Sequence, residues 1–312
     1  MAHPFRYLYK KVHAFNVVLC AIALVGVSDP VFAAACPGNP DALGTSRVVT
    51  ISPKEFDHIG SMQYKQTLPL NDHEVVITFD DGPLPPYTDV ILEILTSQCV
   101  KATHFLIGQM ARTYPSLVRR IYNAGHTVGT HTLDHPLALN HRPLPFVEHE
   151  VDDGIAAVEA AIGDAKAVAP FFRIPGLARS DGVDSFLASQ SLVTWSADVV
   201  ADDWFRGITP NQIVQRAMQR LDAKGRGILL LHDIHPATAM ALPSLLKELK
   251  DRGYRVVHVV PAGKLPESVQ ELPAAPAVAR RAWPRVLRTS AANDGMVISH
   301  RQVKNRVVTK IH

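Results

Sequence analysis

Two adjacent aspartates, Asp80 and Asp81, follow an apolar run, Val75–Phe79, that is typical of a buried strand. Neighbouring ionised carboxylates repel each other, so the pair is costly unless a cation or a proton stabilises it. Gly82 and Pro83 come next and indicate a turn. The stretch predicts a polar group at the end of a strand. A metal ion is one hypothesis for what holds it, and a capped turn is the structural alternative.

Two histidines four residues apart, His131 and His135, provide the imidazoles that such a metal would need. On a helical turn or a tight loop this spacing brings both rings to one face, with about 5–6 Å between the Cβ atoms. Hydrolytic metal sites typically use three protein ligands and leave one position open for water. With Asp81 the set would be Asp-His-His. An H-x-x-x-H pair arises often by chance among 15 histidines, so the prediction depends on the combination.

Composition is that of an ordinary globular protein, with 47% hydrophobic and 20% charged residues. A chain of 312 residues exceeds a typical domain, but barrels of about 250 residues form one unit, so length leaves one or two domains open. A net charge of +3, with no nucleic-acid-binding motif, gives no indication of DNA or RNA as a partner.

Residues 1–35 are typical of an export signal, because basic residues precede an apolar run over 15–27 and small residues follow at Ala33–Ala35. The run of roughly 13 residues is shorter than the ~20 that a membrane span needs. We expect cleavage near Ala35 and a secreted or periplasmic enzyme. An uncleaved anchor and lipidation at Cys36 are the alternatives.

Cleavage before Cys36 would leave Cys36 and Cys99 in the mature chain, an even pair in an oxidising compartment. A disulfide between the N-terminal segment and the barrel and a pair of free thiols are both compatible with this count. Cysteines so far apart in sequence do not indicate a metal site.

From Val75 onward, short β-rich runs alternate with segments that have apolar residues at helical spacing. The predicted strands are Val75–Phe79, Thr103–Ile107, His126–Gly129, Phe171–Arg173, Leu192–Trp195, Gly227–Leu231 and Tyr254–Val259. The predicted helices are Thr88–Gln98, Tyr114–Asn123, Phe146–Ile162, Pro210–Leu221 and Ala239–Asp251, with Gly125 and Gly253 as stops. This alternation predicts a parallel sheet, open or closed.

The candidate polar residues come directly after, or at the end of, these strands. They are Asp80 and Asp81, His131, Arg173, Asp198 and His232. In an α/β barrel the carboxyl ends of the strands form the rim where the chemistry is assembled, whereas structural polar residues would have no reason to collect there. We therefore predict an α/β barrel of about seven parallel strands.

The predicted organisation has four parts: the signal at 1–35, an N-terminal extension at 36–70, a catalytic domain at 71–264 and a tail at 265–312. The extension contains a strand-like run, Val48–Ile51. The tail is rich in Pro, Ala and Arg and has eight basic residues against three acidic ones. We expect a solvated, flexible end; contact with anionic envelope polymers or lipids is the alternative.

Five motifs in order resemble the polysaccharide deacetylase family, which is the fourth carbohydrate esterase family with its NodB-homology domain. They are Thr78–Pro83, His131–His135, Phe172–Pro175, Asp203–Trp204 and Leu230–His232. The resemblance covers about Asp72–Val260. It implies a distorted, NodB-like (β/α) barrel.

The resemblance also implies a role for each motif residue. Asp80 is the general base that takes a proton from water, and Asp81, His131 and His135 bind the metal. His232 protonates the leaving group, Asp203 orients and charges His232, and Arg173 holds Asp80 in place. Leu230 would line the pocket for the acetyl methyl, and Pro175, Gly176 and Trp204 would contact the substrate.

The sequence departs from the family pattern in two places. The third motif usually continues with a tyrosine whose backbone N–H helps to bind the oxyanion, but this chain has Gly176. Gly176 keeps the backbone N–H, but the absence of the tyrosine ring leaves that side of the substrate site more open. The fourth motif, Asp198–Trp204, is two residues longer than usual, so Asp202 could replace Asp203 beside His232. We favour Asp203 because it is adjacent to Trp204.

The resulting prediction is a metal-dependent deacetylase for N-acetylglucosamine units of chitin-like or peptidoglycan-like polymers. Zinc fits the ligand set best, and cobalt is possible because divalent metals compete through geometry and availability. An O-acetyl esterase of the xylan type, a deformylase and a catalytically inactive carbohydrate-binding relic are alternatives. A non-haem iron oxygenase also uses two histidines and a carboxylate, but its short His-x-acid pair is absent here.

Overall fold

The structure is a computed structural model that describes residues 36–263 together with Met1. The predicted export signal, apart from Met1, and the predicted basic tail lie outside the described residues. Among the residues that are described, no helix is both long enough and apolar enough to cross a bilayer.

The described residues form a ten-stranded sheet in which all neighbouring strands run parallel. The strands are β1 (Thr45–Ile51), β2 (His58–Ile59), β3 (Glu74–Asp80), β4 (Thr103–Leu106), β5 (Thr127–Thr130), β6 (Phe171–Phe172), β7 (Val193–Trp195), β8 (Val199–Val200), β9 (Gly227–His232) and β10 (Arg255–Pro261). Their order is β1-β10-β3-β4-β5-β6-β7-β2, while β9 also pairs with β3 and carries β8. Within residues 36–263, no strand pairing closes the sheet into a complete ring.

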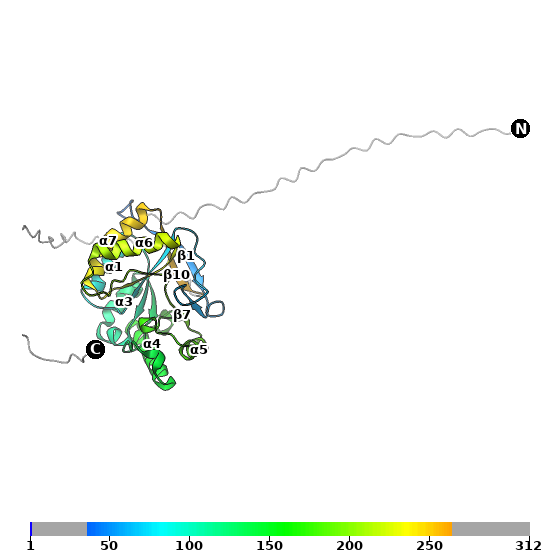
Figure 1. Cartoon of the computed structure of the whole chain (residues 1–312), viewed down its shortest axis with the longest axis vertical. Coiled ribbons are helices and arrows are strands. Elements are labelled where there is room, and N and C mark those ends of the chain that lie inside the picture. Colours follow the sequence, from blue (N-terminus) through cyan, green and yellow to red (C-terminus); the bar gives the residue numbers. More distant parts are fainter. Residues whose placement is uncertain (2–35, 264–312) are drawn as a thin grey trace, which may run out of the picture. The chain divides into compact units, whose positions relative to one another are not determined.

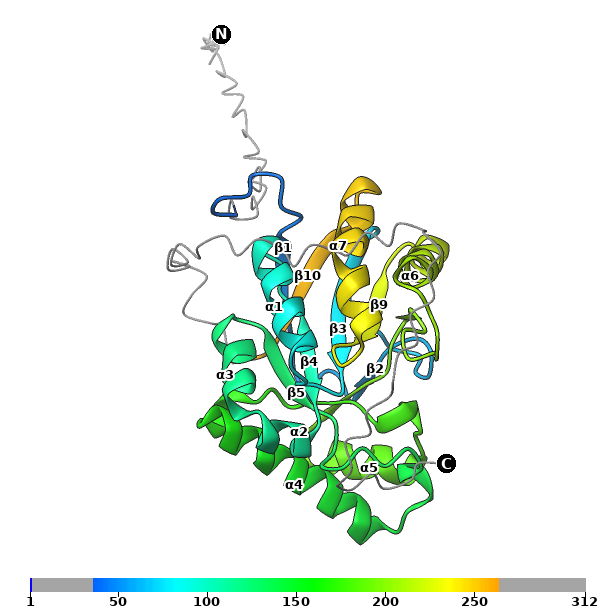
Figure 2. The same cartoon turned by 90° about the vertical axis from the view of Figure 1, so that its left-hand side faces the viewer.

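Helices lie around the strands, as Figures 1 and 2 show. Seven of them fall within residues 36–263. They are α1 (Tyr87–Ser97), α2 (Gly108–Thr113), α3 (Pro115–Asn123), α4 (Leu144–Ile162), α5 (Asp181–Ser189), α6 (Pro210–Lys224) and α7 (Pro236–Asp251). Short 3₁₀ turns occur at η1 (Leu139–His141), η2 (Ala165–Ala167) and η3 (Pro175–Leu177). Parallel strands surrounded by helices confirm the predicted α/β fold of the distorted-barrel type.

Strand β3 shows how the sequence pattern sets the two faces of the sheet. Val75, Ile77 and Phe79 belong to an apolar cluster with buried residues of α1, α6 and α7, whereas Val76 belongs to a second cluster with other strands. Successive side chains of a strand point to opposite faces. Asp80 is therefore on the face of Val76, away from the helices, at the last position of the strand.

On the side of the sheet away from these helices, aromatic side chains pack together within a largely aliphatic cluster. The Trp195 ring lies 5.4 Å from Phe105 and 5.1 Å from Phe171, measured between ring centroids. The guanidinium carbon of Arg173 lies 4.2 Å from the centroid of the Phe105 ring. The buried guanidinium of Arg173 therefore packs on this aromatic cluster, next to the carboxyl ends of the strands.

All seven predicted strands occur within two residues of their predicted ends, and all five predicted helices within three. Gly125 and Gly253 follow helices with positive φ angles of 79° and 76°, as expected for stops. The sequence pattern did not reveal α2, α5, β2 and β8, and the two strands have only two residues each. The N-terminal extension pairs with the rest of the sheet through β1, which lies beside β10.

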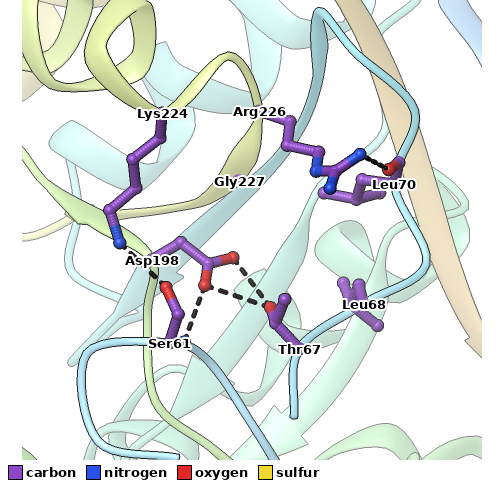
Figure 3. Close-up of a pocket in the computed structure, with 8 residues that line it drawn as sticks. All are labelled: Ser61, Thr67, Leu68, Leu70, Asp198, Lys224, Arg226 and Gly227. Carbon is purple, nitrogen blue, oxygen red and sulfur yellow. Dashed lines mark hydrogen bonds between the residues drawn. The ribbon is translucent and has the colours of Figure 1, made fainter. Parts of the chain in front are cut away.

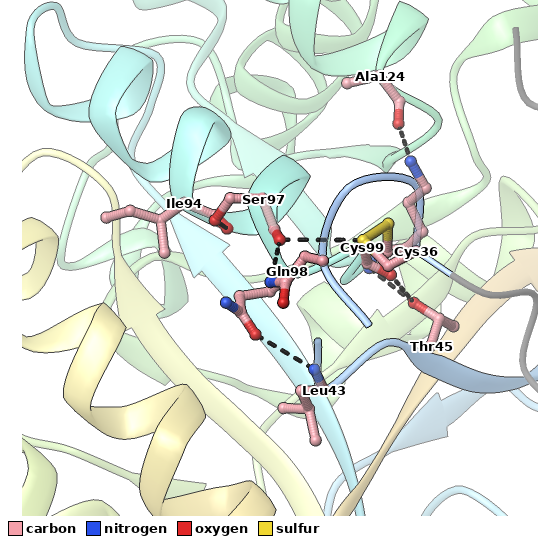
Figure 4. The surroundings of a disulfide bond; sticks show 10 residues. Cys36, Leu43, Thr45, Ile94, Ser97, Gln98, Cys99 and Ala124 are labelled. Carbon is pink, nitrogen blue, oxygen red and sulfur yellow. Dashed lines mark hydrogen bonds between the residues drawn. A yellow bond between two sulfur atoms is a disulfide. The ribbon is translucent and has the colours of Figure 1, made fainter. Parts of the chain in front are cut away.

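A disulfide joins Cys36 to Cys99, with 5.7 Å between the Cα atoms (Figure 4). Hydrogen bonds reinforce the link, because the side chain of Asn39 donates to the carbonyl of Ser97 and the hydroxyl of Thr45 donates to that of Cys99. The structure thus decides between the two options that the cysteine count left open. It attaches the N-terminal segment next to the end of α1.

Replacing both Cys36 and Cys99 with serine is expected to lower the free energy of unfolding by roughly 2–4 kcal/mol, because the bond closes a loop across a sequence separation of 63. Urea unfolding with and without reductant measures this. Reductant should destabilise the wild type and leave the double variant unchanged. Equal midpoints for the wild type in both conditions would show that the bond does not form.

Candidate active site

Strand register brings the predicted site residues to one level of the sheet. Asp80 at the end of β3 is paired with His232 at the end of β9 and with Phe105 on β4. Thr130 on β5 is paired with Phe172 on β6, so the next residue of each strand, His131 and Arg173, also leaves the sheet at this edge. The carboxyl ends therefore meet as the sequence pattern predicted.

Asp81, His131 and His135 form a compact group whose potential ligand atoms all lie within 4.8 Å of one another. The Nε2 atoms of His131 and His135 are 3.4 and 3.2 Å from Oδ1 of Asp81. This oxygen is buried and has no hydrogen-bond partner in the structure, which fits an atom reserved for a cation. The residues predicted as metal ligands are thus brought together with the donor set of a divalent-metal site.

The backbone fixes which nitrogen of His131 faces Asp81. Nδ1 of His131 is 2.6 Å from the carbonyl oxygen of Arg173, and because a carbonyl can only accept, Nδ1 carries the proton. The lone pair of Nε2 then points toward Asp81, as a metal ligand requires. Burial lowers the pKa of His135, which favours the neutral imidazole that binds metal.

Asp81 itself leaves the regular strand geometry. Its φ angle of 74° is unusual for a residue other than glycine and turns its side chain out of the strand alternation. Burial would raise the pKa of Asp81, but the nearby His131, together with His232 and His135, lowers it below its ordinary value. The carboxylate is therefore ionised and available to a cation.

Asp80 is held by a fully buried arginine. Nη1 of Arg173 donates to Oδ1 of Asp80 at 2.6 Å and to the hydroxyl of Thr78 at 2.9 Å, and Nη2 donates to the carbonyl of Ser196 at 3.1 Å. Burial lowers the pKa of Arg173, while the charge and hydrogen bond of Asp80 oppose this. Oδ2 of Asp80 is 3.9 Å from Nε2 of His131, so one oxygen is anchored and the other lies beside the metal-ligand group.

His232 forms a pair with Asp203 on the other side of the group. Nδ1 of His232 is 2.8 Å from Oδ1 of Asp203, and the other carboxylate oxygen accepts from the His232 backbone and the Thr238 hydroxyl. Burial would lower the pKa of His232, but Asp203, aided by Asp81 and Asp80, raises it to about 9. The imidazole is therefore protonated at neutral pH.

Asp202, the alternative partner of His232, is committed elsewhere. Its carboxylate forms ion pairs with Arg216 and Arg220 on α6. The pKa of Asp202 is lowered, and the largest cause is its hydrogen bond with Arg220. Asp203, the residue next to Trp204, is therefore the partner that forms the hydrogen bond with His232.

The remaining predicted site residues surround this centre. Trp204 is 42% exposed, and its ring lies edge-on to His232 with 5.5 Å between centroids. Leu230 is buried on β9, two positions before His232 and so on the same face of the sheet. Pro175 and Gly176 form a short turn after β6, in which Gly176 has a φ of 58°.

The prediction that Asp198 lies at the catalytic rim is wrong. Its carboxylate accepts hydrogen bonds from the backbone of Ser61 and the hydroxyl of Thr67 (Figure 3). It also accepts one from the backbone of Ile228. Ile228 is near the start of β9, four residues or roughly 13 Å along the strand from His232. The chain turns back after β7 to enter β8, which the sequence pattern did not reveal, and Asp198 instead anchors the N-terminal extension.

The sequence pattern did not indicate His104, which is buried behind the Asp81 loop. Asp233 is buried, accepts from the Thr88 hydroxyl, and lies 3.4 Å from Nδ1 of His104. A Cβ added to Gly82 would be 2.2 Å from Oδ1 of Asp233, so the group packs directly against the loop. A histidine inside an otherwise apolar strand was the available signal. His235, also left without a role, has its ring 5.7 Å from that of His232.

An α/β barrel that brings an Asp-His-His metal-ligand set between a carboxylate and a protonated imidazole is the architecture of a metal-assisted hydrolase. The family model for polysaccharide deacetylase matches residues 67–193, which include the first three motifs. A peptidoglycan-N-acetylglucosamine deacetylase of Bacillus cereus is 34% identical over 66% of this chain and 94% of its own length. The chain therefore belongs to the polysaccharide deacetylase family, whose members are hydrolases.

Two further relatives show how far the similarity extends. A chitooligosaccharide deacetylase of Azorhizobium caulinodans is 35% identical over 55% of this chain and 79% of its own length. The solved structure of a peptidoglycan deacetylase from Bdellovibrio bacteriovorus has a TM-score of 0.61 and 31% identity. That alignment covers 69% of this chain and 59% of the solved one, so this chain matches only part of the latter.

Replacing Gly82 with alanine is expected to lower the free energy of unfolding by roughly 1–3 kcal/mol and to weaken zinc binding, because the new Cβ would overlap Asp233 and displace the Asp81 loop. Urea unfolding and zinc titration measure the two effects. The matched control is Gly182→Ala on α5, where an added Cβ has no neighbour within 4 Å. Identical behaviour of the two variants would contradict the close packing.

Proposed function

We propose that the chain is a metal-dependent deacetylase that removes N-acetyl groups from N-acetylglucosamine units of peptidoglycan-like or chitin-like polymers. The observation that carries this proposal is the Asp-His-His group with its ligand atoms within 4.8 Å, flanked by anchored Asp80 and protonated His232. A carboxylate and an imidazolium on either side of one metal site are what hydrolysis of an amide needs: a proton acceptor for water and a proton donor for nitrogen.

Asp81, His131 and His135 would hold the ion, and zinc suits one carboxylate and two imidazoles, with cobalt as an alternative. When bound, a divalent cation supplies Lewis-acid polarisation of the acetyl carbonyl and acidifies water. The buried orphan oxygen of Asp81 and the fixed tautomer of His131 support this assignment.

The two proton transfers divide between Asp80 and His232. Asp80, anchored by Arg173, accepts a proton from the water whose oxygen bonds to the acetyl carbon. His232, kept protonated by Asp203, donates a proton to the departing amine nitrogen as the carbon–nitrogen bond breaks. The products are acetate and a free amino sugar. The backbone N–H of Gly176 in its short turn would stabilise the negative charge that develops on the carbonyl oxygen.

The substrate class rests on the relatives and on the exposed aromatic side chain at the rim. The two curated relatives above are named for peptidoglycan N-acetylglucosamine and for chitooligosaccharides. Trp204, exposed beside His232, offers a surface on which a sugar ring can stack. The export signal predicted at residues 1–35 would place the enzyme where such polymers occur.

Replacing Asp80 with asparagine is expected to lower acetate release by at least ~100-fold while metal binding persists, because the proton acceptor is lost and the ligand group stays. Acetate would be measured from chitooligosaccharides, peptidoglycan and acetylated xylan in parallel, with chelator and with re-added zinc. Asp81→Asn is the contrasting variant and should lose zinc as well as activity.

These results also separate the alternatives. Release that depends on metal and Asp80 from the first two substrates supports the proposal, whereas release from xylan alone would indicate an O-acetyl esterase. A chain that binds zinc but releases no acetate from any of the three would be a binding relic.

The pH profile tests the assignment of His232 as the proton donor. A donor must be protonated, so kcat/KM should fall as pH rises through the pKa of His232. Asp203→Asn removes the neighbouring negative charge and lowers this pKa, so the alkaline fall should move to lower pH by roughly one unit or more. Asp202→Asn, which breaks the ion pairs with Arg216 and Arg220, is the matched control. It should leave the pH of the alkaline fall in kcat/KM unchanged.

A further inference from the structure

The middle residue of the turn after β6, Gly176, has no side chain. Gly176 sits between Pro175 and Leu177 with a φ of 58°, a conformation that disfavours residues with a Cβ. A Cβ built there would meet Leu137, whose Cδ2 would be 3.3 Å away. The place that a side chain at position 176 would take is therefore already bordered by Leu137, which comes from a different loop.

The loop that carries Leu137 also carries two of the proposed metal ligands, His131 and His135. Leu137 is two residues after His135 and is 58% exposed, although it is one of the most apolar side chains. Single exposed leucines are common on protein surfaces and need no explanation. This one differs because it lies against the turn of Gly176 and comes two residues after His135.

The position of Leu137 is fixed from below. Leu139, two residues later, is fully buried and packs in one apolar cluster with Phe172 and Ile174, the residues that lead into the turn of Gly176. Its backbone N–H donates to the carbonyl of Pro136. The loop of Leu137 and the turn of Gly176 thus share one core and keep their separation.

Leu137 and Trp204 border opposite sides of the metal-ligand group. Trp204 contacts His232 at the end of β9, which pairs with one side of β3, whereas Gly176 follows β6, which is reached from β3 through β4 and β5. Asp81 follows β3, between them. A sugar whose acetyl group reaches the metal must fit between an exposed indole and an exposed leucine.

We propose that Leu137 is a specificity-determining residue. From a different loop of the same chain, it supplies the apolar wall that is missing at Gly176, and it contacts the C–H face of the N-acetylated sugar. This inference rests on the proposed function, because it takes the substrate to be an N-acetylglucosamine oligomer. An aliphatic wall buries C–H surface without requiring stacking, which suits a pyranose ring held on its other side by Trp204.

Binding of chitotetraose, with all four sugars N-acetylated, to the zinc-loaded Asp80→Asn chain tests the wall without requiring turnover. Leu137→Ala in that background is expected to raise Kd roughly tenfold, the scale for removing part of an apolar contact in a pocket. Leu137→Met, which keeps the apolar volume, should restore affinity to within about twofold. The matched control, Leu144→Ala, removes a leucine that is 49% exposed at the start of α4 and should leave Kd unchanged.

Turnover by chains with native Asp80 gives an independent readout. Leu137→Ala should raise KM for chitotetraose and leave hydrolysis of 4-nitrophenyl acetate, which has no sugar ring, unchanged. Equal Kd for the Leu137→Ala and Leu144→Ala chains, or no binding of chitotetraose to the Asp80→Asn parent, would overturn the inference. Binding that depends on Leu137 without any acetate release by the native chain would instead contradict the proposed function alone.

Discussion

The site depends on one buried residue, Arg173, which acts on both halves of the chemistry. Its guanidinium anchors Asp80, and its backbone carbonyl accepts from His131 and thereby aims the second nitrogen at Asp81. Below it, the Phe105 ring covers one face of the cation. Removing one partner of a buried ion pair costs about 3–5 kcal/mol because the other charge is left uncompensated. Arg173 therefore contributes both to the stability of the fold around the site and to the orientation of Asp80 and His131.

Two different buried ion pairs lie at one rim. Asp80 has a buried guanidinium beside it, whereas His232 has a buried carboxylate, Asp203, fixed by the Thr238 hydroxyl and by the His232 backbone. Groups whose surroundings drive them to opposite charge states are suited to act as base and acid in one reaction. Among the proposed metal ligands between them, Asp81 has a buried carboxylate oxygen, Oδ1, that accepts no hydrogen bond from the described residues.

Hydrophobic periodicity was sufficient for the long elements, because each repeated pattern buries one face against the same core. It failed for β2 and β8, whose two residues give no period to detect, and for α5, where polar residues interrupt the pattern. The error over Asp198 has the same origin: without β8, a residue that follows β7 was assigned to the rim. Only the pairing of β8 with β9 places Asp198 near the start of β9.

The sequence by itself determined the residue types and order of the motifs, hence the family and the candidate ligands, because local spacing and strand ends are written along the chain. Tertiary structure alone decided between Asp202 and Asp203, joined Cys36 to Cys99, and brought Leu137 against Gly176. Each of these contacts joins segments that are far apart in sequence or depends on which way a side chain points. Such facts follow from the packing of strands and helices, and no local pattern records them.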